Sequence, residues 1–131
     1  VRKHHLTPLA RIGAAASGAV EPRIMGIGPV EAARRLTART GRAAQDHDVI
    51  ELNEAFAAQV LACTRAWGMA DDDLRLNAHG GAIAMGHPLG MSGARLAGTA
   101  ARRLAETGGR SALVTLCVGV GQGVALELLP A

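Results

Sequence analysis

Short apolar runs alternate with amphipathic stretches along the chain, which is typical of strands and helices in regular succession. The small apolar residues at 9–16 and the run DVIEL at 48–52 each predict a strand. Between them, Pro29 fits the first position of a helix, where its missing N–H is not needed, and Gly41 fits the end of that helix. The first part of the chain therefore predicts strand, helix, strand.

A second helix follows the second strand directly. Phe56, Val60, Cys63 and Trp67 are spaced by four, three and four residues, which places them on one buried face of a helix. Asn53 is expected to cap its N-terminus, because an amide oxygen can accept the free N–H groups there. The same spacing assigns Cys63 to the core as a small hydrophobic residue.

The next segment is less regular. Residues 74–76 predict a short strand, and residues 77–93 a long loop rich in glycine and histidine. A helix is expected from Ser92 to the glycine pair at 108–109, because its apolar positions recur at helical spacing. Its charged residues are expected to face outward: Arg95, Arg102, Arg103 and Glu106.

The last part of the chain predicts a hairpin, because the apolar strands 111–117 (SALVTLC) and 122–129 (QGVALELL) are separated by a glycine-rich turn. The full order is β-α-β-α-β-α-β-β. This order predicts an α/β fold in which a mostly parallel sheet of five strands, with the last strand antiparallel, is flanked by helices.

The composition fits one compact domain over residues 1–131, since 49% of the residues are hydrophobic and 19% are charged. Only 2% are aromatic, which argues against base stacking on a nucleic acid, and the net charge of +3 is spread along the chain. No apolar stretch approaches the ~20 residues of a membrane span. Two cysteines are too few for a disulfide framework, so we expect a cytoplasmic protein. The chain opens in mid-pattern, and we expect a piece of something longer.

Three polar residues stand at predicted strand ends or in the adjoining loops: Asn53, His87 and Cys117. Ligands of open α/β sheets bind at that edge, so these are the candidate catalytic residues. His87 can donate or accept a proton near neutral pH. Cys117 precedes Gly119, whose N–H group could face an oxyanion. The alternatives are a surface histidine and a buried structural cysteine.

The same three residues also form the set of a cysteine hydrolase, because only their geometry would matter for that chemistry. The glycines at 119, 121 and 123 do not indicate a dinucleotide loop, since no helix follows them. His79, His87 and Cys117 lack a close pair of the C-x-x-C kind, so no metal site is expected.

Three segments resemble, in family order, the three C-terminal signatures of thiolases: 53–57 (NEAFA), 80–95 (GGAIAMGHPLGMSGAR) and 117–123 (CVGVGQG). Residues 6–12 (LTPLARI) and 24–29 (IMGIGP) resemble the segment that leads into the C-terminal half of that family. The resemblance implies the C-terminal half of a thiolase, with a five-stranded mixed sheet flanked by helices. It also implies a CoA-thioester acyltransferase that makes or cleaves 3-oxoacyl-CoA.

The resemblance further implies a role for each matched residue. His87 would activate a nucleophilic cysteine and bind the thioester oxygen, with a water held by Asn53. Cys117 would be the acid and base that moves the α-proton, and the Gly119 N–H would contribute to the oxyanion hole. The remaining matched residues would line the acyl and pantetheine pocket: Ala55 and Phe56.

The nucleophilic cysteine of the family lies in its N-terminal half and has no equivalent here. The resemblance therefore predicts that this chain is inactive without an N-terminal thiolase half, in the same or a separate chain. It implies an acyl-CoA substrate and no separate cofactor, and we expect a homo-oligomer. The alternatives are a thiolase-fold domain that only binds acyl-CoA or a partner, and a Cys-His-Asn hydrolase. His79 departs from the asparagine common in the family.

Overall fold

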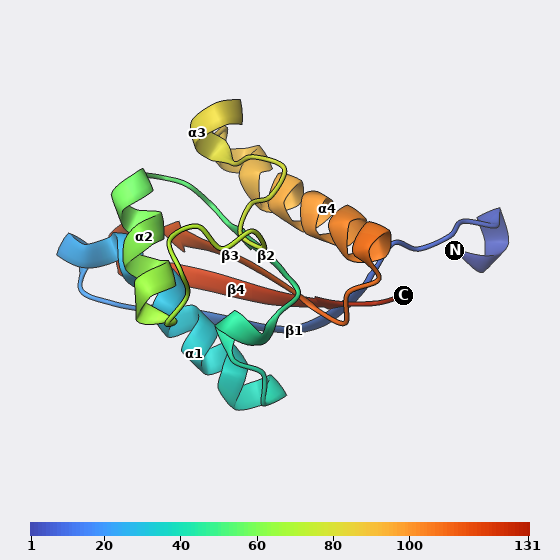
Figure 1. Ribbon diagram of the computed structural model, residues 1–131, viewed down its shortest axis with the longest axis horizontal. Coiled ribbons are helices and arrows are strands. Elements are labelled where there is room, and N and C mark those ends of the chain that lie inside the picture. Colours follow the sequence, from blue (N-terminus) through green and yellow to red (C-terminus); the bar gives the residue numbers. More distant parts are fainter.

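Four strands form one mixed sheet in the computed structural model, which describes residues 1–131 (Figure 1). They are β1 (Arg11–Ala19), β2 (Val49–Leu52), β3 (Ala112–Val118) and β4 (Gln122–Leu129), in the order β1-β4-β3-β2. β2 and β3 are parallel, whereas β4 is antiparallel to both of its neighbours. The α/β class is confirmed. The last strand, β4, runs opposite to the other three, as expected, but it inserts between β1 and β3, so that only the pairing of β2 with β3 is parallel.

Residues 74–76 were one of the five predicted strands, and this prediction is wrong. The segment contributes only a single parallel bridge, between Ile50 and Leu76. Asn77 follows with a φ of 43°, which turns the chain away from the sheet. Its Oδ1 accepts the Leu52 N–H at 2.9 Å, and its Nδ2 donates to the Leu52 carbonyl at 2.8 Å. One side chain therefore satisfies the backbone groups of β2 that a longer fifth strand would pair with.

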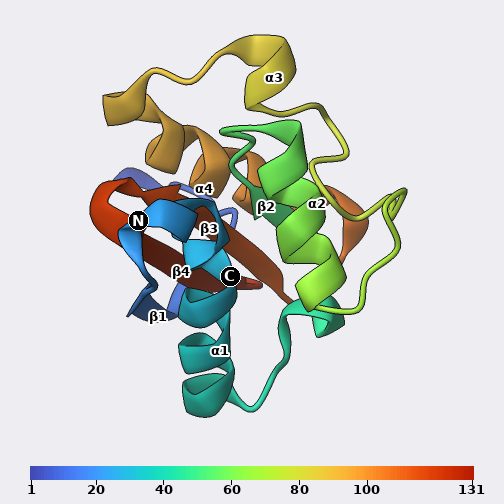
Figure 2. The ribbon, with the colours of Figure 1, turned by 90° about the vertical axis from the view of Figure 1, so that its left-hand side faces the viewer.

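Helices cover both faces of the sheet. α1 (Gly28–Thr40) and α2 (Ala57–Ala66) lie on one face and α4 (Leu89–Thr107) on the other. Figure 2 shows the segment between α2 and α4, which carries the short α3 (Ala82–Met85). No helix combines the length and apolar character needed to cross a bilayer. Four 3-10 segments complete the chain: η1 (Arg2–His4), η2 (Pro22–Ile27), η3 (Ala44–Asp46) and η4 (Gly119–Gly121).

The helix boundaries follow the sequence signals only in part. α1 has proline in its first turn and ends at Gly41 with a φ of 74°, as expected. α2 begins later than expected, and its N-cap is Phe56, so the expected capping role of Asn53 is wrong. The N–H of Asn53 instead donates to the Thr115 carbonyl at 3.0 Å and extends the pairing of β2 with β3. α4 begins at Leu89, so the predicted loop at 77–93 contains α3 and the first turn of α4.

Each face of the sheet has its own apolar cluster. Cys63 is fully buried, with its thiol 3.6 Å from the Gly26 carbonyl of η2, which confirms its place in the core, and burial raises the pKa of its thiol to about 11. The larger cluster lies under α1 and α2 and includes Leu36, Ile50, Leu52 and Leu113. The smaller cluster lies under α4 and includes Val49, Leu96, Ala100, Leu104 and Val114.

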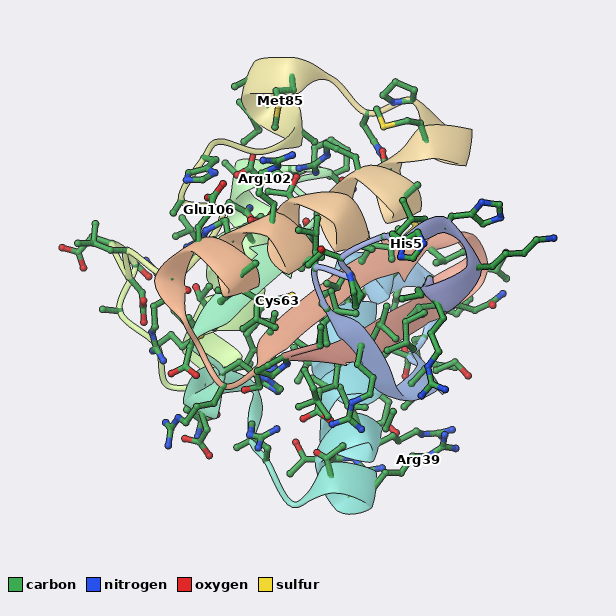
Figure 3. The ribbon with its side chains drawn as sticks, turned by 90° about the vertical axis from the view of Figure 1, so that its right-hand side faces the viewer. His5, Arg39, Cys63, Met85, Arg102 and Glu106 are labelled. Atoms are coloured by element: carbon green, nitrogen blue, oxygen red, sulfur yellow. The ribbon has the colours of Figure 1, made fainter.

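Two arginines of α4 are directed inward, against expectation. Nη1 of Arg103 lies 3.2 Å from Oε1 of Glu51, and Nη1 of Arg95 lies 3.7 Å from Oε2 of the same carboxylate. Arg102 and Glu106 face outward as expected and are labelled on α4 in Figure 3. The expectation for Arg95 and Arg103 fails because Glu51, within a short apolar strand, supplies a buried partner for both.

His47 is expected to make the fold sensitive to acid. Its ring is buried beside the Ser111 hydroxyl, and burial, together with the charge of Arg42, lowers its pKa from 6.5 to about 4. The unfolded state therefore binds a proton first, so a stabilisation of about 3 kcal/mol present above pH 6.5 is lost as the pH falls towards 4. Urea unfolding across this range should show a smaller loss in His47→Gln. His4→Gln, at an exposed position, is the control, and equal pH dependence in both variants would contradict the assignment.

Candidate active site

Asn53 and His87 meet between the carboxyl end of β2 and the N-terminus of α4. Nδ2 of Asn53 lies 3.3 Å from Nε2 of His87. Asn53 is fully buried, whereas His87 is half-buried in the segment that leads into α4. The structure thus brings together two residues that are 34 positions apart in the sequence.

Ser92, in the first turn of α4, holds the other side of the His87 ring. Its Oγ lies 2.6 Å from Nδ1 of His87, and it donates its proton to the Pro88 carbonyl at 3.2 Å. With that proton engaged, Ser92 accepts an N–H from Nδ1, which assigns the tautomer from the hydrogen-bond network. Nε2 of His87 therefore carries the only free lone pair of the ring. In this structure the lone pair accepts from Asn53, and it is the position at which the ring can take up a proton.

The second polar atom of Asn53 has no partner within the chain. Its Oδ1 is buried without a hydrogen bond. Leaving a buried oxygen unsatisfied costs about 1–3 kcal/mol. The site therefore offers an acceptor for a donor such as a water molecule or a substrate group.

Cys117 lies near the end of β3, the parallel neighbour of β2. Leu52 pairs with Thr115, so Cys117 stands at the same edge of the sheet as Asn53. Its side chain is half-buried, and burial raises the pKa of its thiol, so the thiol is protonated at neutral pH. No hydrogen bond joins it to His87 or Asn53. The structure therefore brings Cys117 to the same edge as the other two residues, without a direct contact.

The turn after Cys117 combines an open glycine with two crowded ones. A Cβ atom at Gly119 would meet nothing within 4 Å, whereas at Gly121 and Gly123 it would overlap backbone carbonyl groups. Val120, between Gly119 and Gly121, adopts a φ of 65°, which is strained for a β-branched residue. The two crowded glycines are thus required by packing, and Gly119 is the one with free space beside it.

Ala55 and Phe56 lie between β2 and α2, with Phe56 exposed. Neither lines the small hollow of about 190 Å³ that lies beside this segment. The residues that line the hollow are mostly apolar: Glu54, Ala57, Val60, Leu61 and Ile83.

Glu54 anchors the glycine-rich segment beside the site, which sequence analysis did not anticipate. Its carboxylate accepts Asn77 Nδ2 at 2.9 Å and the Ile83 N–H at 3.0 Å. A Cβ at Gly81 would overlap this carboxylate. Sequence analysis also missed Ser92, and the available signal for both residues was their place in the segments 53–57 and 80–95.

Metal-ligating side chains do not converge in this chain. No three His, Cys, Asp or Glu side chains lie close enough together to hold a metal ion. The arrangement at the sheet edge can instead move protons. His87 is held by hydrogen bonds at both of its ring nitrogens, and the Cys117 thiol is protonated.

Fold and site together define an α/β domain that holds an asparagine–histidine pair and a cysteine at one edge of its sheet. A family model described as "Thiolase, C-terminal domain" matches residues 6–129. The chain therefore belongs to the thiolase family and corresponds to its C-terminal domain, as the sequence resemblance indicated.

Relatives with assigned names support the same placement. The chain is 62% identical over 128 residues to the beta-ketoadipyl-CoA thiolase of Pseudomonas putida, covering 98% of this chain and 32% of the relative. It is 59% identical over 123 residues to the 3-oxoadipyl-CoA/3-oxo-5,6-dehydrosuberyl-CoA thiolase of Escherichia coli, covering 94% of this chain and 31% of the relative. The chain thus spans about a third of the length of these proteins.

Solved structures agree with the fold. Human mitochondrial 3-ketoacyl-CoA thiolase superimposes with a TM-score of 0.92 at 43% sequence identity. The match covers 100% of this chain and 33% of the human one, and a second structure of the human protein is a complex with CoA.

Proposed function

We propose that this chain is the C-terminal catalytic part of a thiolase-type acyltransferase that makes or cleaves 3-oxoacyl-CoA with acetyl-CoA and CoA. The observation that carries the proposal is the His87 ring, held between Asn53 and Ser92 at the edge where Cys117 stands. The nucleophilic cysteine has no equivalent here, and the relatives are about three times longer than this chain. In this proposal the additional length supplies that cysteine, and the 131 residues alone are inactive.

In the cleaving direction, His87 first takes the proton of the incoming cysteine. Its Nε2 is the unprotonated nitrogen, and it accepts that proton when the thiol replaces Asn53 Nδ2 as the hydrogen-bond donor to its lone pair. The thiolate attacks the 3-oxo carbonyl, and its new C–S bond replaces the bond between C2 and C3 of the substrate. Negative charge on the carbonyl oxygen is stabilised by protonated His87 and the N–H of Gly119, and a water held by Asn53 Oδ1 assists in binding the thioester oxygen.

Cys117 handles the other protons of the cycle. The electron pair left on C2 takes the proton of the Cys117 thiol, which the raised pKa keeps in its protonated form. Acetyl-CoA leaves, and the Cys117 thiolate then removes the thiol proton of incoming CoA. The CoA thiolate attacks the acyl-enzyme and forms the shortened acyl-CoA, while the nucleophilic cysteine leaves as a thiolate and takes its proton back from His87. The coenzyme A thioester is thus the substrate, and the cycle needs no separate cofactor.

The substrate class is proposed from the relatives. The beta-ketoadipyl-CoA and 3-oxoadipyl-CoA thiolases are 59–62% identical to this chain, against 43% for the human 3-ketoacyl-CoA thiolase. This difference supports a 3-oxo dicarboxylyl-CoA and a place in aromatic catabolism. Ala55 and Phe56, which precede α2, are proposed to line the acyl and pantetheine pocket.

Several exposed apolar side chains support the proposal that another part of the complete protein packs on this domain. They gather on α3 and the start of α4: Ile83, Met85, Leu89 and Met91. A contiguous apolar patch on a protein surface commonly marks an interface. We propose that the additional length found in the relatives covers it, and that the complete protein is a homo-oligomer. Both cysteines are free, which supports a reducing compartment such as the cytoplasm.

The proposal is tested by locating the acetyl group that acetyl-CoA transfers to the protein. Acetyl-CoA is added to the longest natural polypeptide that carries the chain, and the acetyl group is located by peptide mass mapping. It should lie on one cysteine beyond residues 1–131, and the 131-residue chain alone should neither become acetylated nor cleave a CoA thioester. Cys117→Ser should slow both this acetylation and the cleavage of 3-oxoadipyl-CoA by about 10²–10⁴-fold, because the proton donor is lost in both steps, while the acetyl group that does form should lie on the same cysteine beyond residues 1–131.

Other outcomes would overturn the proposal. An acetyl group on Cys117 would indicate the Cys-His-Asn hydrolase. Absence of acetylation in the longest polypeptide, with acyl-CoA still bound, would indicate a domain that only binds.

A further inference from the structure

Three charged side chains are buried together between β2 and α4. The Glu51 carboxylate is fully buried, with Arg103 3.2 Å from one oxygen and Arg95 3.7 Å from the other. Burial raises the pKa of the Glu51 carboxyl, and the two guanidinium groups act in the opposite direction. With Glu51 ionised, the cluster carries one net positive charge. Burying a charge is costly unless it is paired. The three side chains are therefore held in a defined arrangement between β2 and α4.

The same interface carries the candidate active site. Glu51 lies on β2, and Asn53 follows the strand directly, with its N–H continuing the pairing to β3, so the side chains of Glu51 and Asn53 both leave the face that α4 covers. On α4, Arg95 follows Ser92 by three positions and therefore shares its side of the helix. Glu51 on β2 contacts the two arginines of α4, and Asn53, just after β2, contacts His87, just before α4. The strand and the helix are thus joined at two points about 7 Å apart along the strand direction.

Apolar packing alone would hold the helix less precisely in register. The α4 side chains on this face include Leu96, Ala100 and Leu104, whose contacts are non-directional. An ion pair away from water, by contrast, weakens with every displacement of its partners. Arg103 also donates to the Arg75 carbonyl at 3.1 Å, so its guanidinium is held from a second segment.

We propose that Glu51, together with Arg95 and Arg103, is a positioning element that sets the register of α4 along β2 and thereby the placement of His87 against Asn53. None of the three side chains touches the reacting atoms. The inference rests on the proposed function for its catalytic consequence, whereas its structural part can be measured on the chain itself.

The chain contains a matched control for an effect on stability alone. Glu127 is also buried and pairs with Arg42, but this pair lies against the end of α1, on the opposite face of the sheet. Removing the charge of either glutamate leaves a cation without its partner. Only the Glu51 change disturbs the contact between α4 and β2.

The test compares Glu51→Gln and Glu127→Gln in the 131-residue chain. The ring nitrogens of His87 are followed by ¹⁵N–¹H NMR, and the stability by urea unfolding. Both variants should lose stability. Only Glu51→Gln should shift the His87 ring nitrogens and reduce the fraction protonated at Nδ1, and Arg103→Lys should shift them less because it keeps the charge. An unchanged His87 ring in folded Glu51→Gln would overturn the proposal.

A second variant covers the case in which Glu51→Gln does not fold. Glu51→Gln combined with Arg103→Met removes one anion and one cation, so the net charge of the cluster stays the same, and the same shift of the His87 ring is expected. In the longest natural polypeptide, these Glu51 variants should lower kcat by up to about 100-fold with little change in KM. Equal kcat values for the Glu51 and Glu127 variants would also overturn the inference. An inactive parent protein would instead refute the proposed function and leave the NMR comparison valid.

Discussion

Replacement of His87 by alanine should lower acyl transfer by about 10²–10⁴-fold in the longest natural polypeptide that carries the chain. The variant removes the nitrogen that accepts the proton of the nucleophile, and with it the contacts to Asn53 and Ser92. The rate of enzyme acetylation by acetyl-CoA in a single turnover measures this step directly. Far-UV circular dichroism should remain unchanged, because the His87 side chain is only half-buried.

Ser92→Ala is the matched control for that substitution. The variant keeps the imidazole but loses the oxygen that orients Nδ1, so a smaller fall in the acetylation rate is expected. A His87→Ala variant that retains acetylation within about twofold of the parent would refute the assigned role. In that case Asn53 and His87 would form a structural contact only.

Replacement of Gly123 by alanine should lower the free energy of unfolding by at least about 3 kcal/mol. A Cβ atom at this position would overlap the carbonyl group of Gly28 and the nitrogen of Pro29. Both groups belong to the backbone at the start of α1, so no side-chain rotation can relieve the overlap. Urea unfolding of the 131-residue chain measures the effect.

Gly119→Ala provides the comparison within the same turn. Its Cβ would meet nothing within 4 Å, so the stability should change by no more than about 0.5 kcal/mol. The N–H proposed for the oxyanion hole is retained in this variant. Equal destabilisation by the two substitutions would show that the turn is limited by backbone freedom rather than by the close approach of α1.

The candidate site was predictable as a set of residues but not as a geometry. Asn53, His87 and Cys117 stand beside apolar runs and glycines, so local pattern and family resemblance both single them out. The local reading of Asn53 as a helix cap failed, because its partner His87 is far away in the sequence and no local rule contains that contact. Ser92 was missed for the same reason, since its role depends on where the His87 ring comes to lie.

The sequence by itself determined the alternation of strands and helices, the ends of α1, the final hairpin and the thiolase family, because these depend on neighbouring residues and on motif wording. The tertiary structure alone decided which long-range partners completed the sheet edge and the interface of α4. Asn77 replaced most of a fifth strand with its side chain. Arg95 and Arg103 turned inward because Glu51 was buried opposite them. In each case the free energy of a buried polar group depends on a partner distant in the sequence, which periodicity along the chain does not report.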